Sequence, residues 1–599
     1  MHWLDLHGLG PTLLLASTLL APAAAQKAPD VRIDTGSEPG AAAASQPRFA
    51  AAGGAIYAVW ADERDGARDI YFNRSVDRGS SWLADATRLD TDTPPGSAAA
   101  VSPDIAVFGD AVFVTWSERR SGASDVYVNR SLDRGETWLP TPVRVDTEPA
   151  GASDSTAPRI AIGGTTVYIV WEDARRPPFR DIYINRSGDG GLSWQPTDTR
   201  LDFGTLPGVA DSYAPQIAAS GASVYVGWLD LRSGRPDVYF NRSTNQGGQW
   251  LPLDRRLDTN APGASSSLTA RLAATGNIVF AVWEERRDDL VRGDIYSNRS
   301  LDGGVTWQSA DVRLDTGSPP GAAASLTPHL ALLGTNAHVV WSDNRNGRFD
   351  IYFNRSVAAG LAWLPASERV DLGTPAGTAD AVLPFVAANA NGTFVAWTDM
   401  RSGDWDVYFN RADPGATSFQ PGDLRLDTDA SGSSAIAPQL AFAGESVVAG
   451  WLDDRSGDAD LRANLAFGAQ PYGIASAGTG GVRPSLDVAG PALFGATPTV
   501  QIRDARGGAL AVLLLGIGPT TQVSIPIGGG VAGVLPTTSQ GLGLGGAAGA
   551  AGEGTLDLPL PLPPSPALLG TNLNLQVGVR DSGSPDGFSL TNAVELWIG

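Results

Sequence analysis

The 599-residue sequence contains no cysteine, so no disulfide bond can stabilise its fold. Lysine is nearly absent as well, because Lys27 is the only one and all other basic residues are arginines. With 64 acidic against 43 basic residues the net charge is −21, and no basic cluster interrupts the acidic background. Such a composition excludes the usual ways of binding nucleic acid or an anionic membrane surface. We therefore expect no nucleic-acid partner.

Long apolar runs are missing after residue 25, and residues 510–517 fall well short of the ~20 residues that span a bilayer. The chain begins with an apolar stretch over residues 13–20, followed by three alanines at residues 23–25, which is typical of a cleaved signal peptide. We expect residues 1–25 to be removed and the protein to be secreted or on the cell surface. Because the first residues carry no Lys or Arg, an uncleaved anchor is the alternative.

Histidine is scarce too, since only His329 and His338 follow the expected signal peptide. A histidine zinc site or a Ser-His-Asp triad is therefore not expected, and we predict no metal site and no cofactor. Calcium bound by the Asp-rich loops is left open.

Glycine and proline, at 72 and 42 residues, are abundant and suggest turn-rich β structure. Length alone would suggest about four domains at ~150 residues each. A repeat of about 56 residues changes that estimate. Each unit carries a Trp-x-Asp/Glu-x-Arg motif, then Asp-Ile/Val-Tyr-x-Asn-Arg, a turn that often ends in Trp, and Arg-Leu/Val-Asp. The tryptophans of the first motif are Trp60, Trp116, Trp171, Trp228, Trp283, Trp341, Trp397 and Trp451.

Each unit reads as four short strands, in the first unit over residues 48–52, 56–60, 70–75 and 87–90. Four strands repeated at this spacing indicate a β-propeller blade, with a solenoid as the rival. The chain ends favour a ring. An Arg-Ile-Asp strand at residues 32–34 precedes the first unit, whereas the last unit lacks its fourth strand. We predict an all-β chain: an eight-bladed propeller over residues 26–467 that the N-terminal strand closes, a linker at 468–483, and a small β-sandwich at 484–599.

Four turns between the third and fourth strands read SVDRGSSW, SLDRGETW, SGDGGLSW and SLDGGVTW, beginning at residues 75, 131, 187 and 300. They resemble the Asp-box of BNR repeats in the sialidase superfamily. A turn carboxylate can accept backbone N–H bonds while Gly supplies a positive φ. The resemblance implies a structural role for Asp77, Asp133, Asp189 and Asp302, on the face opposite the active site. Ligands would then bind on the other face, here called the top.

A binding site requires positions that differ between the units. The Trp-x-Asp-x-Arg motif is nearly identical in every unit, so salt bridges explain it better than a ring of metal or sugar ligands. One position does vary, namely the residue after the Pro that opens the innermost strand, where Ala270 replaces the Pro in the fifth unit. It is Arg48, Asp104, Arg159, Gln216, Arg271, His329, Phe385 and Gln439 in order along the chain. Polar side chains at the mouth of a channel are costly to bury without partners. We predict that Arg48, Arg159, Arg271, Gln216, His329 and Gln439 bind the ligand.

The three arginines fall in alternate units, and guanidinium groups form bidentate pairs with carboxylates. The sialidase resemblance implies a three-arginine clamp on a substrate carboxylate and a tyrosine nucleophile. Tyr213 lies two residues before the strand-opening Pro of the fourth unit, between Arg159 and Arg271, so it is the candidate nucleophile, with Asp104 and Asp211 as candidate acids. Glu172 and Glu285 lie at the two lengthened top loops. The alternatives are that each arginine neutralises a loop aspartate and that Tyr213 is a packing residue.

Three functions remain open from the sequence. The first is a sialidase-like propeller that binds a glycan or another anionic ligand at the channel mouth. The second is an exo-α-sialidase-type glycoside hydrolase, and the third is a protein-interaction scaffold. We expect a monomer.

Overall fold

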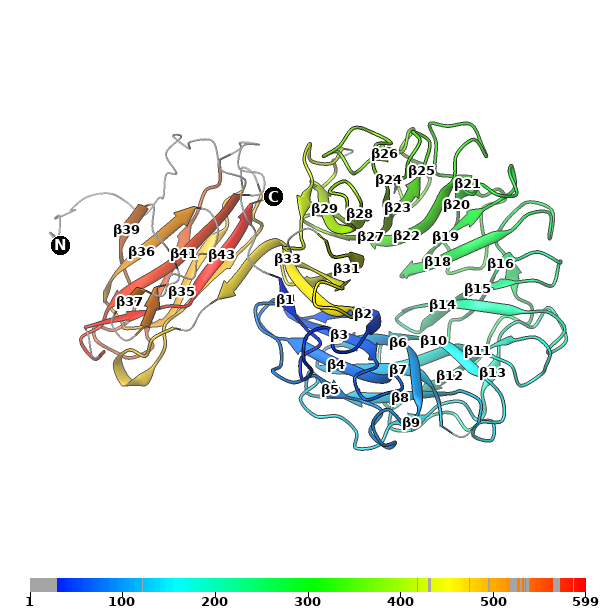
Figure 1. Cartoon of the computed structure of the whole chain (residues 1–599), viewed down its shortest axis with the longest axis horizontal. Coiled ribbons are helices and arrows are strands. Elements are labelled where there is room, and N and C mark those ends of the chain that lie inside the picture. The colour runs from blue at the N-terminus through cyan, green and yellow to red at the C-terminus, as the bar shows by residue number, and fades with distance from the viewer. Residues whose placement is uncertain are drawn as a thin grey trace.

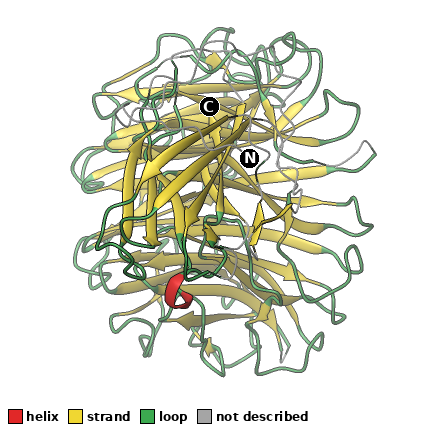
Figure 2. Ribbon diagram, turned by 90° about the vertical axis from the view of Figure 1, so that its left-hand side faces the viewer, coloured by secondary structure: helices red, strands yellow, loops and turns green. Residues whose placement is uncertain are grey.

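The computed structural model describes residues 30–598, except 121, 417, 429–431, 473–474, 494–495, 518–524, 528–529, 533, 535–537, 564–570 and 585–586. The expected signal peptide at 1–25 lies outside the described residues. Within them the chain is all β apart from one turn of 3-10 helix, η1 (Thr479–Gly481) (Figure 2). No helix in the described part is long and apolar enough to cross a membrane.

Residues 44–425 form seven successive antiparallel sheets, each ordered as in the sequence from an inner to an outer strand. Sheets 1 to 4 are β2 (Ala44–Ala52), β3 (Ala55–Asp62), β4 (Asp69–Ser75), β5 (Thr87–Arg88); β6 (Ala99–Phe108), β7 (Ala111–Arg119), β8 (Asp125–Ser131), β9 (Val143–Arg144); β10 (Ser155–Gly163), β11 (Thr166–Asp173), β12 (Asp181–Ser187), β13 (Thr199–Arg200); and β14 (Ser212–Ser220), β15 (Ser223–Asp230), β16 (Asp237–Ser243), β17 (Arg255–Arg256). Sheets 5 to 7 are β18 (Ser267–Thr275), β19 (Ile278–Glu285), β20 (Asp294–Ser300), β21 (Val312–Arg313); β22 (Ser325–Leu333), β23 (Asn336–Asp343), β24 (Asp350–Val357), β26 (Glu368–Arg369), with the short β25 (Ala362–Trp363) also on β24; and β27 (Ala381–Asn389), β28 (Gly392–Asp399), β29 (Asp406–Ala412), β30 (Leu424–Arg425).

An eighth set of strands consists of β31 (Ala435–Ala443), β32 (Ser446–Asp453) and β33 (Asp460–Tyr472), and β1 (Val31–Arg32) pairs with β33. The innermost strand of each sheet contacts that of the next, and β31 contacts β2, so the sheets radiate around a common centre (Figure 1). The second and third strands are buried on both faces, as the run of buried residues in β3 shows. This arrangement is consistent with a β-propeller.

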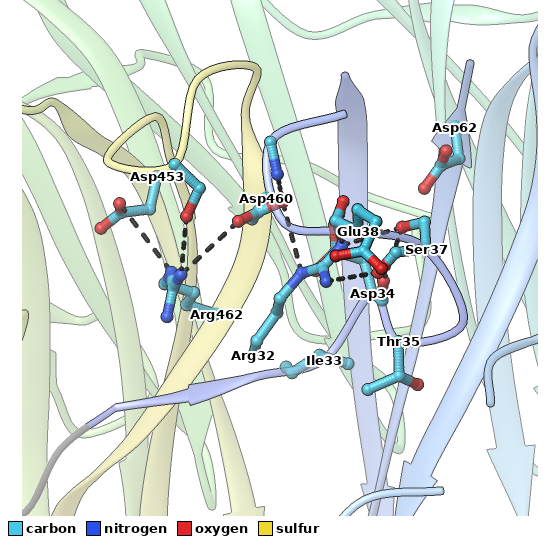
Figure 3. Close-up of polar contacts among 12 residues, drawn as sticks. Arg32, Ile33, Asp34, Thr35, Ser37, Glu38, Asp62, Asp453, Asp460 and Arg462 are labelled. Atoms are coloured by element: carbon cyan, nitrogen blue, oxygen red, sulfur yellow. Dashed lines mark hydrogen bonds and ion pairs between the residues drawn. The ribbon is translucent and has the colours of Figure 1, made fainter. Parts of the chain in front are cut away.

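The first strand, β1, is held to β33 by backbone pairing and by ion pairs (Figure 3). Arg32 binds Asp34 at 2.9 Å and Asp460 at 3.3 Å, and Arg462 binds Asp460 at 3.5 Å. Backbone pairing of Val31 with Ala463 aligns these charges. The N-terminal strand therefore joins the ring where the sequence pattern predicts it.

Every innermost strand has a bulge at the same place. The residue before the strand-opening Pro, or before Ala270, has a positive φ, for example +53° at Gln46 and +54° at Ala214. Because Ser45 pairs with Ala61 and Arg48 with Val59, the two bulged residues lie opposite Trp60, the tryptophan of the repeated motif. A bulge re-aims the side chains beside it, and the next residue lies at an equivalent level on all eight innermost strands.

The C-terminal part is continuous with the eighth sheet through β33, whose residues 468–472 pair with β43 (Ala593–Ile598). The segment expected as a linker at 468–483 thus begins inside a strand. A first sheet continues through β41 (Thr571–Arg580), β36 (Leu510–Ile517) and β39 (Thr538–Gly543), with β42 (Phe588–Leu590) on β41. A second sheet consists of β34 (Ser485–Ala489), β35 (Thr499–Ala505) and β40 (Gly554–Pro559), and β37 (Ile525–Ile527) pairs with β38 (Gly530–Ala532). Leu575 and Val577 of the first sheet share a buried core with Val500 and Ile502 of the second.

Candidate functional site

The repeated Trp-x-Asp/Glu-x-Arg motif is neutralised inside each sheet. In sheet 1, Asp62 accepts hydrogen bonds from Trp60 Nε1 at 2.8 Å and from the Arg64 guanidinium at 2.6 Å, and that guanidinium lies 4.0 Å above the Tyr71 ring. The equivalent ion pairs are Glu118–Arg120, Asp173–Arg175, Asp230–Arg232, Glu285–Arg287, Asp343–Arg345, Asp399–Arg401 and Asp453–Arg455. These carboxylates hold their own sheet together, as the salt-bridge interpretation predicts. The described residues contain no group of three or more His, Cys, Asp or Glu that could hold a metal ion.

The Asp-box-like turns use their carboxylates locally. Asp77 accepts bonds from Ser75 Oγ at 2.7 Å and from the backbone and side chain of Ser81 at 2.9 and 2.6 Å. Gly79, with φ +86°, donates its N–H to Ser75 Oγ at 2.7 Å. The same contacts recur around Asp133, Asp189 and Asp302. The carboxylates on this face therefore stabilise turns. The asparagines of the Asn-x-Ser sequences are likewise buried and not displayed for glycosylation.

The varying residues that follow the bulges form a ring around the channel, which we call the channel ring: Arg48, Asp104, Arg159, Gln216, Arg271, His329, Phe385 and Gln439. All eight side chains are partly exposed. Sheets 2, 4, 6 and 8 supply side chains with hydrogen-bond acceptors, whereas sheets 1, 3 and 5 supply arginine and sheet 7 supplies Phe385. Charged or polar side chains of different character thus alternate along most of the channel ring.

Three members of the channel ring accept a hydrogen bond from a backbone amide of the next sheet. Asp104 Oδ2 accepts from Ile160 N at 3.0 Å. His329 Nδ1 accepts from Val386 N and Gln439 Oε1 from Phe49 N, both at 3.3 Å. The His329 ring also lies 3.9 Å from that of Phe385. Burial, together with the nearby positive charges of Arg271 and Arg48, lowers the pKa of His329 to about 3, so this ring is neutral.

The three arginines have unequal environments. Arg48 Nε lies 3.7 Å from Asp104 Oδ1. Arg159 and Arg271 each donate to the carbonyl of the preceding residue, at 3.0 and 3.3 Å, and no described carboxylate lies within 4.0 Å of either guanidinium. Burial lowers the pKa of Arg271 to about 10, and the positive charges of Arg159 and Arg48 act in the same direction. Among the three arginines only Arg48 is therefore neutralised by an aspartate, and Arg159 and Arg271 have no anionic partner among the described residues.

A cavity of about 500 Å³ adjoins the channel ring at sheets 3 to 5. Its lining includes three members of the ring, Arg159, Gln216 and Arg271, and the side chains of Tyr213 and Glu284. This volume lies within the ~300–1,000 Å³ range of ligand pockets. The structure thus brings together Tyr213 and two of the three predicted arginines, while Arg48, His329 and Gln439 belong to the rest of the ring.

The candidate acids lie apart from this cavity. Asp211 forms a bidentate pair with Arg180, with both distances 3.0 Å. Although burial raises the pKa of Asp211, these hydrogen bonds outweigh it and the net pKa is lowered, so the carboxyl stays ionised. Asp104 sits in the channel ring, and neither it nor Asp211 lines the cavity. Burial and the negative charges of Asp211 and Glu172 raise the pKa of Tyr213, so its phenol is neutral.

Glu284 is the acidic residue that the sequence reasoning missed. It lies between Trp283 and the repeated carboxylate Glu285, at the position that Glu172 has in sheet 3. Elsewhere this position holds Ala61, Ser117, Leu229, Ser342, Thr398 and Leu452. Glu284 is 4% exposed, Arg286 Nε donates to its Oε1 at 3.1 Å, and burial raises its pKa. Comparing this position among the eight units would have found it.

No protein-family model and no curated protein matches the chain. Among solved structures it is similar to an α-L-arabinanase of Penicillium chrysogenum, at 14% identity over 61% of this chain and 93% of that one, with a TM-score of 0.35. It is also similar to the polysaccharide lyase Uly1 (12% identity, 60% and 88% coverage, TM-score 0.40) and to an endosialidase of phage phi92 (11%, 76% and 74%, TM-score 0.34). These likenesses are too remote to assign an activity or a residue role.

Proposed function

We propose that this chain is a secreted, monomeric, eight-bladed β-propeller of the Asp-box type, followed by a C-terminal β-sandwich, that binds an acidic glycan at its channel mouth. The eight strand sets, the pairing of β1 with β33 and the four turns with the same contacts support the blade count and the Asp-box type. The core shared by the two C-terminal sheets supports the sandwich.

One observation supports an anionic ligand. In a chain of net charge −21, Arg159 and Arg271 line a cavity and have no acidic partner among the described residues. The positive charge of Arg159 disfavours that of Arg271, and a bound anion would offset this repulsion. A cavity of this size accommodates a sugar ring, and its tyrosine can pack against one.

Titration calorimetry with acidic and neutral saccharides tests this proposal. We expect D-glucuronate or N-acetylneuraminate to bind and D-glucose not to bind. Arg159→Ala should weaken acidic-sugar binding at least about tenfold, because charge-assisted hydrogen bonds contribute ~1.5–3 kcal/mol. Arg134→Ala is the matched control, since this arginine is exposed and pairs with Asp110 on the opposite face. Equal binding of glucose and glucuronate would contradict the proposal.

A hydrolytic function is the second candidate, because Tyr213 and Glu284 line the same cavity. The raised pKa of Glu284 suits a proton donor, whereas Tyr213 would need a base before it could act as a nucleophile. Hydrolysis of a chromogenic sialoside tests this candidate with Glu284→Gln, Tyr213→Phe and Asp211→Asn. We expect the first two variants to lose activity and the third to retain more of it. Activity unchanged by Tyr213→Phe and Arg159→Ala would exclude this site.

A further inference from the structure

The ring residue between Arg159 and Arg271 differs from the ring residues of the other even-numbered sheets. The even-numbered sheets supply Asp104, Gln216, His329 and Gln439, and three of these accept the backbone amide of the next sheet. Gln216 does not: its Nε2 donates to the carbonyl of its own Pro215 at 2.9 Å, whereas Gln439 Nε2 donates to Pro47 of the next sheet at 2.6 Å. The Gln216 side chain is directed to its own strand although the neighbouring sheet offers a donor.

The donor that Gln216 leaves unused is the amide of Leu272. Leu272 pairs with Ala281 as Ile160 pairs with Ile169, so the two amides have equivalent places on their strands. Ile160 N points away from its sheet toward Asp104. By the same register Leu272 N–H points toward the channel, and no described residue accepts a hydrogen bond from it outside the strand ladder. An open amide beside two guanidinium groups is a site for an oxyanion.

Asp104 shows how such a site is filled. It lies between Arg48 and Arg159 in the order of the ring, as Gln216 lies between Arg159 and Arg271. One oxygen of Asp104 is 3.7 Å from Arg48 Nε and the other accepts the Ile160 amide. The place between Arg48 and Arg159 is therefore filled by a carboxylate of the chain itself. The equivalent place between Arg159 and Arg271 holds the neutral side chain of Gln216.

We propose that a carboxylate of the ligand occupies the gap between Arg159 and Arg271, accepting the Leu272 amide as Asp104 accepts the Ile160 amide. The inference rests on the proposed function in placing an acidic ligand at the channel mouth, and it goes further by naming the contacts. The same gap opens onto the cavity beside Tyr213, so the rest of a sugar acid attached to this carboxylate has room there.

Gln216→Asp tests the proposal directly, because it supplies the missing carboxylate from the chain. We expect this variant to fold at least as stably as the wild type and to bind glucuronate at least about tenfold more weakly, a difference of ~1.4 kcal/mol. Gln216→Asn is the matched comparison, because it has the size of the aspartate without its charge, and it should bind glucuronate more tightly than Gln216→Asp does. Wild-type affinity in Gln216→Asp would overturn the proposal.

Acetate separates this inference from the proposed function. Melting temperatures are compared in sodium acetate and in sodium chloride of equal ionic strength at pH 7. Acetate should raise the melting temperature of the wild type and Gln216→Asn, but not that of Gln216→Asp. An acetate effect without glucuronate binding would support the gap and contradict the glycan function. Glucuronate binding that Gln216→Asp leaves intact, or no acetate effect in any of the three proteins, would overturn the gap.

A second variant removes a carboxylate from the channel ring where Gln216→Asp adds one. Asp104→Ala removes the internal carboxylate and leaves the amide of Ile160 open beside Arg48. Crystals grown in acetate should then show two carboxylates at the channel ring, one at each gap, whereas the wild type should show one beside Leu272. Acetate at neither gap in both crystals would count against the proposal.

Discussion

The Trp-x-Asp/Glu-x-Arg motif and the channel ring both distribute charged side chains around the same ring of sheets, but only the motif pairs every one of its charges. Each motif carboxylate is buried against its own arginine and tryptophan, as Asp343 is against Arg345 at 2.5 Å and Trp341 at 3.2 Å. In the channel ring the described residues include no such partner for Arg159 or Arg271. Repeated charge thus stabilises the fold, whereas charge that differs between sheets is available for a ligand.

The largest effect is expected when the repeated pairing is broken. Asp343→Ala removes the acceptor for Trp341 Nε1 and the Arg345 guanidinium, and leaves that arginine without an ion-pair partner among the described residues. Breaking a buried pair in this way costs about 3–5 kcal/mol. Calorimetry should show a clearly lower melting temperature. Asp110→Ala, at a carboxylate 59% exposed, is the control and should shift the melting temperature little.

The channel ring should respond in the opposite way. Arg271→Ala removes a cation that burial and two neighbouring arginines disfavour, so we expect an unchanged or higher melting temperature. Binding of glucuronate should fall about 10- to 100-fold, the equivalent of ~1.5–3 kcal/mol. A loss of stability as large as that of Asp343→Ala would show that Arg271 belongs to the structural class, and the contrast between the two regions would fail.

A smaller effect is expected from pH, through a second repeated set. In most sheets an aspartate of the Arg-Leu/Val-Asp segment is buried near the carboxylate that begins the third strand, as Asp202 is near Asp181. Burial and that negative charge raise the pKa of Asp202 to about 7. The related groups have pKa values of about 6 to 8, namely Asp34, Asp90, Asp146, Asp258 and Asp371.

The sign follows from linkage. Between the pKa of an unfolded aspartate, ~3.9, and about 7, the folded state holds protons that the unfolded state has released, so stability falls as pH rises. We expect a higher melting temperature at pH 5 than at pH 8. Asp202→Asn keeps a neutral group at one of these sites and should make the pH dependence less steep. A melting temperature that rises from pH 5 to pH 8 would show that these carboxylates are ionised in the folded protein.

The repeat made much of the fold predictable. Residues that recur at a fixed spacing make the same local contacts in each unit, so the four strands, the turn around Asp77 and the pairing of residues 31–32 with the last sheet followed from the pattern. The bulge did not, because its positive φ falls on ordinary residues such as Gln46 and Leu383 and no glycine marks it. The strand β33 continues across the expected boundary at 468, but its pairing partner changes there from β32 to β43.

The site was less predictable, because its contacts join different sheets. Nothing near Arg48 in the sequence indicates that Asp104, 56 positions further on, neutralises it, while no described carboxylate pairs with Arg159 or Arg271. Glu285 was singled out in place of Glu284, since the lengthened loop drew attention to the repeated acid. Comparing the same position among the eight units is more informative. It shows that an acid recurs in every unit at the position of Glu285, but occurs in only two units, as Glu172 and Glu284, at the preceding position.

The smallest change in melting temperature is expected from an exposed ion pair that belongs neither to the repeated motif nor to the channel ring. Arg78, in the first Asp-box-like turn, pairs with Asp487 of the C-terminal part through two bonds of 2.8 Å, and the two side chains are 27% and 41% exposed. Exposed pairs contribute ~0–1 kcal/mol. Arg78 also has a φ of +61°, where the third turn has glycine at Gly190.

Arg78→Ala loses the ion pair and keeps the unfavourable φ, whereas Arg78→Gly loses the pair but relieves the backbone, by ~1 kcal/mol. We therefore expect calorimetry to show a slightly lower melting temperature for the alanine variant and a value near that of the wild type for glycine. Small-angle scattering should show both parts still docked, because β33 runs through both and Trp597 packs against Val448 and Leu465. Separation of the parts in either variant would mean that this exposed pair, and not the shared strand, fixes the C-terminal part to the ring.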